Sequence, residues 1–162
     1  MARILFVMTG ADQWSLIRGA KHHTGYWAHE FSAPYQAFTE AGHEIVVATP
    51  GGVVPPVDRG SLAPNTNGGD EQAAKVAEII AGATPLEQPI ALADARPADY
   101  AAVFYPGGHG PMEDLAVDPD SATLLVETLD SGKPFLQADR NLHTGQNPAS
   151  AGPLAAAVLA AL

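Results

Sequence analysis

The chain has 162 residues, enough for one domain that buries about two-thirds of its surface. Its 8 basic and 18 acidic residues give a net charge of −10, so we expect no binding to nucleic acid or to anionic membrane surfaces. It contains no cysteine, which excludes disulfides, thiolate metal sites and a thiol nucleophile. Since no apolar stretch reaches the ~20 residues of a membrane span, we expect a cytoplasmic protein.

Short apolar runs and helical spacing predict an α/β domain. Three continuous apolar runs are typical of buried parallel strands, at 4–8, 44–49 and 100–105. Between the first two, an apolar stripe predicts a helix over 30–41, formed by Phe31, Tyr35 and Phe38. Gly42 follows this helix where a C-terminal cap belongs. A strand–helix–strand unit of this kind indicates a doubly wound sheet.

The segments between these elements are less regular. Residues 10–26 are polar and irregular, and 51–70 form a long loop rich in glycine and proline. Small and branched apolar residues at helical spacing predict a second helix over 73–82. Residues 85–97 are a connector that accommodates a short edge strand.

The C-terminal part predicts two further helices. The first has Asp120–Ser121 as its cap and an inner face formed by Leu124, Leu125, Thr128 and Leu129. Two strand-like pieces follow, at 135–139 and 141–144. The last helix has an apolar stripe formed by Leu154, Val158, Leu159 and Leu162. No repeat or linker divides the chain, so residues 1–162 are expected to form a single domain.

Glycines follow the third strand directly, at the sheet edge where open parallel sheets bind ligands. Gly107 and Gly108 can direct backbone N–H groups into a cleft, as in an oxyanion hole. The alternative, which the spacing alone favours, is a tight strand-to-helix turn without a ligand. The sequence contains neither a phosphate-binding glycine motif nor a GxSxG motif, which argues against nucleotide binding and a serine triad.

Glu30 begins the first predicted helix. It is either a charge that stabilises the helix start or a general acid/base facing the same cleft. Four histidines are candidate metal ligands: His109, and the three that lie near Glu30 in sequence, His22, His23 and His29. Their irregular spacing within a loop is unlike a metal site, so we predict no metal.

Five blocks together resemble the ThiJ/PfpI family, in its glyoxalase III and holding-chaperone branch, within the class I glutamine amidotransferase-like superfamily. They are the residues at 25–38, 48–52, 56–58, 103–115 and 144–150. The resemblance implies a flavodoxin-like three-layer sandwich with a mostly parallel sheet, and a homodimer. It also implies cofactor-free chemistry, either conversion of methylglyoxal to lactate or deglycase repair of glycated groups, by a nucleophilic cysteine.

The resemblance assigns roles to four residues. Glu30 matches the family's catalytic glutamate, Gly107 and Gly108 match its oxyanion donors, and His109 matches its pocket histidine. In the family, the Gly-Lys-Pro found here at 132–134 leads into the strand before the cysteine. Here the following residues resemble the penultimate strand instead, so an internal deletion near 134–135 removes the cysteine with about one central strand–helix unit.

If the family's fourth strand is missing, the third strand, at 100–105, needs another strand to pair with on that side. We predict a strand order of 2-1-3 with the pieces at 135–139 and 141–144 moved inward against the 100–105 strand. No thiolate is present to attack a carbonyl, so the favoured function is a catalytically silent family member. The alternatives are a holding chaperone or binding module for unfolded proteins or small carbonyl compounds, and a residual hydrolase or hydratase that uses Glu30 and water.

Overall fold

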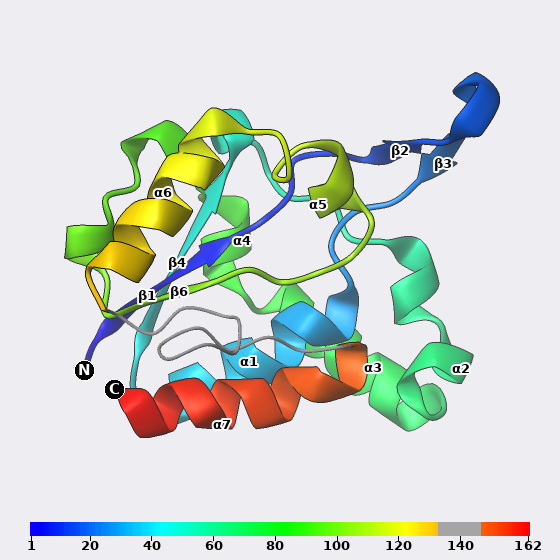
Figure 1. Ribbon diagram of the computed structural model, residues 1–162. Helices are drawn as coiled ribbons and strands as arrows, with labels where there is room; N and C mark the ends of the chain where they lie inside the picture. The colour runs from blue at the N-terminus through cyan, green and yellow to red at the C-terminus, as the bar shows by residue number, and fades with distance from the viewer. Residues whose placement is uncertain (133–146) are drawn as a thin grey trace.

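In the part of the chain that the structure describes, four parallel strands form the central sheet in the order β5-β4-β1-β6, and a separate antiparallel pair, β2-β3, projects from it (Figure 1). The computed structural model describes residues 1–132 and 147–162. The strands are β1 Arg3–Val7, β2 Gln13–Ser15, β3 Lys21–His23, β4 Glu44–Thr49, β5 Ile90–Ala91 and β6 Ala102–Phe104. The helices are α1 Ala28–Glu40, α2 Pro64–Asn67, α3 Asp70–Ala81, α4 Thr84–Glu87, α5 Gly110–Glu113, α6 Pro119–Asp130 and α7 Ala151–Ala161.

Strand β1 is buried on both faces, which explains its continuous apolar sequence. Ile4 and Phe6 belong to a core cluster that includes side chains of α1 and α7. Leu5 and Val7 point the other way, into a second cluster that includes Leu124 of α6. Figure 1 shows the result, with α1, α3 and α7 on one side of the sheet and α6 on the other. This confirms the three-layer α/β prediction.

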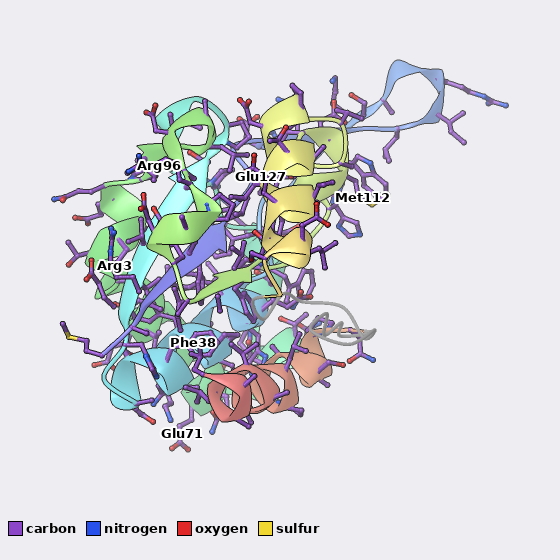
Figure 2. The ribbon with its side chains drawn as sticks, turned by 60° about the vertical axis from the view of Figure 1, so that its left-hand side comes forward. Arg3, Phe38, Glu71, Arg96, Met112 and Glu127 are labelled. Atoms are coloured by element: carbon purple, nitrogen blue, oxygen red, sulfur yellow. The ribbon has the colours of Figure 1, made fainter. Side chains whose placement is uncertain are left out.

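The first helix covers the sheet with its aromatic stripe. Phe31 and Phe38 are fully buried and pack edge-on against Phe6, with ring centroids 5.7 and 5.9 Å apart. Figure 2 shows Phe38 between the helix and the sheet. Tyr35 lies at the margin of the cluster, half-buried, and stacks on Phe31. Gly42 ends the helix with φ of 81°, as predicted.

The predicted order of the three main strands is confirmed, because β1 lies between β4 and β6. The edge strand expected within 85–97 is β5, which pairs with β4. The strand-like pieces at 135–139 and 141–144, and the proposed junction at 134–135, lie outside the described residues. In the described part of the chain, no helix is long and apolar enough to cross a membrane.

Several local predictions were wrong. Residues 10–26, expected to be irregular, contain the β2-β3 hairpin, and the predicted loop 51–70 contains α2. Two residues assigned to inner helix faces are partly exposed: Leu129 at 37% and Leu162 at 44%. Leu129 lies beside the buried stripe of α6, which is formed by Ser121, Leu124 and Thr128, and Leu162 lies beyond the last residue of α7.

The cap of α6 was also misplaced. Asp118, not Asp120 or Ser121, is the N-cap, and its Oδ1 accepts hydrogen bonds from the N–H groups of those two residues, at 2.8 and 2.9 Å. The helix therefore begins at Pro119, and Asp120 is the acidic residue of its first turn.

Replacing the two aspartates separately tests this cap. We expect Asp118→Ala to lower the free energy of unfolding by about 1 kcal/mol, because two N–H groups lose their acceptor. Asp120→Ala removes only a favourable charge near the helix start and should lower it by about 0.5 kcal/mol or less. Urea unfolding measures both values, with Asp118→Ser as a control that retains a capping oxygen. Equal effects of the two alanine variants would contradict the assignment.

Candidate functional site

Three loops meet through their backbones beyond the carboxyl end of β1. The Tyr26 N–H donates to the Pro56 carbonyl and the Asp58 N–H donates to the Tyr26 carbonyl, both at 2.9 Å. On the other side, the Trp27 N–H donates to the Gly107 carbonyl at 2.8 Å. The segment at 25–27 therefore bridges the loop after β4 and the glycine loop after β6.

The two glycines of this loop are constrained by different neighbours. A Cβ at Gly108 would lie 2.4 Å from the Gly25 carbonyl oxygen, and Gly108 has φ of 130°, a conformation that disfavours other residues. A Cβ at Gly107 would lie 2.3 Å from Glu30 Oε2, so a side chain there would displace the Glu30 carboxylate. Gly108 is therefore needed for the close approach of the backbones, and Gly107 makes room for Glu30.

Glu30 lies in the first turn of α1 and faces the glycine loop. Its Oε2 accepts a hydrogen bond from the Gly107 N–H at 2.8 Å. Burial raises the pKa of the Glu30 carboxyl above its ordinary value, against the lowering effects of the Gly107 hydrogen bond and of nearby His29. A half-buried carboxyl whose pKa is raised toward neutrality can both accept and donate a proton, so its environment suits an acid/base role.

The two glycine N–H groups are not equivalent. The Gly107 N–H is already bonded to Glu30, so a bound oxyanion would have to replace that bond. The Gly108 N–H has no acceptor among the residues that the structure describes. The role of both groups as oxyanion donors stays a prediction, and Gly108 is the donor that is available without rearrangement.

His109 completes the loop and is fixed by an aromatic neighbour. Its ring stacks on that of Trp14, with centroids 4.6 Å apart and planes 6° from parallel. Its Nδ1 is buried and has no hydrogen-bond partner within the described parts of the chain. An unpaired buried nitrogen is unfavourable unless a ligand or water bonds to it. Its role as a pocket histidine stays a prediction.

Sequence reasoning missed the residue that anchors this loop. The Asp114 carboxylate accepts hydrogen bonds from Thr9 Oγ1 at 2.9 Å, from the Gly10 N–H at 2.7 Å and from the Ala11 N–H at 3.1 Å. It thereby joins the segment after the glycine loop to the end of β1. The signal available in the sequence was an aspartate five residues after His109, within a block already singled out.

The histidines near Glu30 in sequence do not form one cluster, although His29 is close enough to lower the pKa of the Glu30 carboxyl. His22 and His23 are exposed on β3, while His29 Nδ1 lies 3.3 Å from the Pro148 carbonyl oxygen. Across residues 1–132 and 147–162, no three histidine, aspartate or glutamate side chains are placed to hold a metal ion.

The pH dependence of stability tests the environment of Glu30. Its raised pKa means that above about pH 4.5 the folded chain binds more protons than the unfolded chain, so ionisation of Glu30 destabilises the fold as pH rises. Glu30→Gln retains an oxygen for the Gly107 N–H but does not ionise.

We therefore expect the free energy of unfolding of Glu30→Gln, relative to the unmodified chain, to increase between about pH 4 and about pH 7.5 in urea titrations. Glu127→Gln, on the exposed face of α6, is the matched control. A difference for Glu30→Gln that stays constant over this range would mean that the carboxyl is not destabilised by burial.

The sequence matches no protein-family model and no curated protein, but the fold matches solved structures. Rapid Encystment Protein 24 kDa of Francisella tularensis is 17% identical, with 99% of each chain covered and a TM-score of 0.79. Glyoxalase III of Candida albicans is 23% identical, with 82% of this chain covered and a TM-score of 0.63. The match covers 54% of that enzyme, so this chain spans about half its length.

A ThiJ/PfpI domain protein from Brachyspira murdochii is 12% identical, with 98% of this chain and 95% of that chain covered and a TM-score of 0.53. Identities at this level establish the arrangement of the elements and nothing about chemistry. The chain therefore has the fold of the ThiJ/PfpI-type proteins, a flavodoxin-like parallel sheet between layers of helices.

Proposed function

We propose that this chain is a member of the ThiJ/PfpI family, in its glyoxalase III branch, that has lost the nucleophile and is catalytically silent. The observation that carries the proposal is the contact between Glu30 and the Gly107 N–H in a chain without cysteine. The expected acid/base and glycine loop lie against each other, while the residue that would form a bond to the substrate is missing.

The chemistry explains why these remaining groups are not enough. Methylglyoxal conversion by the family's route begins with addition of a thiolate to a carbonyl carbon. Glu30 can move a proton and the Gly108 N–H can stabilise an oxyanion, but neither supplies the attacking electron pair of a thiolate. Removing a nucleophile from such a group of residues typically lowers the rate by about 10⁴-fold or more.

Lactate formation from methylglyoxal tests catalytic silence. We expect the chain and its Glu30→Ala variant to give the same rate as buffer, because no thiolate is present. Turnover that is abolished in Glu30→Ala would contradict the proposal and favour a hydratase or hydrolase in which Glu30 activates water, a role that its raised pKa suits. Turnover that survives Glu30→Ala indicates a contaminating enzyme, and repurification to a constant specific rate identifies it.

A second candidate is a holding chaperone for unfolded clients, favoured by apolar side chains on the surface. Val53 and Val54 follow each other in sequence after β4 and are 48% and 63% exposed. Exposed apolar side chains provide contact area for the apolar segments of unfolded chains.

Light scattering of a heat-aggregating client enzyme tests this second candidate. If the chain holds clients, an equimolar amount delays aggregation, and Val53→Ser with Val54→Ser shortens the delay at least about twofold because apolar contact area is lost. Val126→Ser, on the exposed face of α6, is the control and should leave the delay unchanged. Absence of any delay at equimolar chain rules out the chaperone function.

A further inference from the structure

The β2-β3 hairpin, residues 13–23, projects from the body of the molecule and is called the arm below (Figure 1). Its three-residue strands pair only with each other in the described part of the chain, and all of β3 is exposed. The tip is apolar and strained: Ile17 is 89% exposed, and Arg18 has a positive φ of 66°. A two-stranded hairpin that makes no other contact is only marginally stable in water, so such an arm needs support.

The root of the arm is fixed firmly. Trp14 stacks on His109, and the Glu113 carboxylate accepts hydrogen bonds from the Ser15 N–H at 2.9 Å and from Ser15 Oγ at 2.6 Å. Lys21 Nζ donates to Ser15 Oγ at 2.6 Å and lies 3.8 Å from Glu113. Figure 2 shows Met112, which is 60% exposed, close to this root. The arm is thus held in place at one end and uncovered at the other.

The charge of the arm is opposite to that of the rest of the chain. It carries Arg18 and Lys21 and no acidic residue, which leaves a net charge of −12 for the other residues of a chain whose total is −10. Arg18 forms no ion pair with the described residues. A basic, apolar-tipped projection on an acidic molecule is complementary to the body of a second copy.

A groove that fits such a projection lies at the root of the arm. It has a volume of about 770 Å³, with His22 and His23 on one side and the segment 56–60 on the other. Pro56 and Val57 give it an apolar wall, and Asp12 and Asp58 give it negative charge, with Arg59 as the one cation at its margin. The Asp12 carboxylate forms no ion pair with any residue that the structure describes.

The arm of a given chain does not reach its own groove. Arg18 lies in the turn at the tip of the projecting arm, whereas Asp12 precedes β2 at its root, and the two form no ion pair within the described chain. The arm of a second copy, approaching in the opposite direction, brings its Arg18 to this Asp12. The groove and the arm lie next to each other in each chain. A two-fold axis between two chains therefore places each arm in the other chain's groove, and the two equivalent contacts close the assembly as a dimer.

We propose that the arm is a dimerisation element, and that in a homodimer each arm lies in the groove at the root of the partner's arm. Ile17 contacts the apolar wall formed by the partner's Pro56 and the partner's Val57, and Arg18 pairs with the partner's Asp12. Because Trp14 connects the arm to His109, this docking also fixes the histidine of the candidate site. The proposal does not depend on whether the site is catalytic.

Sedimentation velocity on the full chain tests the interface. We expect a dimer that weakens at least about tenfold between about 50 mM and about 500 mM salt, because the Arg18–Asp12 pair is screened. Ile17→Asp should raise the dissociation constant at least about tenfold, since it places a charge against the apolar wall. Val126→Asp, a matched change on α6, should alter it less than about twofold.

An exchange of charges identifies the contact itself. Arg18→Asp and Asp12→Arg should each weaken the dimer, whereas the two changes together in one chain restore both copies of the pair and return the dissociation constant toward its original value. Circular dichroism verifies that each variant is folded. A chain that is monomeric at about 100 μM, or a dimer indifferent to Ile17→Asp and to both charge reversals, would overturn the proposal.

Discussion

The candidate site depends on the close approach of backbones at the carboxyl edge of the sheet. The segment at 25–27 bonds to Pro56 on one side and to Gly107 on the other, and the Gly108 Cα lies where a Cβ would overlap the Gly25 carbonyl. Everything else at the site follows from this contact. It sets where α1 begins, hence where Glu30 lies, and it leaves the Gly107 N–H directed at the Glu30 carboxylate.

The elements that the sequence predicts well are those in which the pattern of apolar residues within the element itself shows which side chains are buried. Strand β1 and helix α1 carry continuous or periodic apolar residues, and each face of β1 finds one layer of helices. The arm was missed because its strands do not bury an apolar face, so no alternation marks them. Its residues are held instead by Glu113, about a hundred positions away in the chain, through contacts that no local pattern records.

The same distinction applies to the candidate site. Glu30 and the two glycines were identified because a carboxylate at a helix start and glycines after a buried strand are conspicuous in sequence, and the structure brings them together. Asp114 was missed because its partners at the end of β1 are more than a hundred residues away. Leu129 was misassigned because helical spacing predicts the direction of the buried stripe, which includes Leu124 and Thr128, but not its width.

The presence of these residues in a chain without cysteine has, in part, a structural explanation. Gly108 is required by the packing of the loops, and the Glu30 carboxylate accepts a hydrogen bond from the neighbouring Gly107 N–H. Selection for folding alone would therefore retain part of what looks like a catalytic site. The raised pKa of Glu30 is different, because burying this carboxyl opposes folding when it is ionised and a neutral side chain would avoid that penalty. Among the residues of the site, Glu30 is therefore the one whose presence is least explained by the stability of the fold. If the site has a function, a substitution at Glu30 is the change that should reveal it.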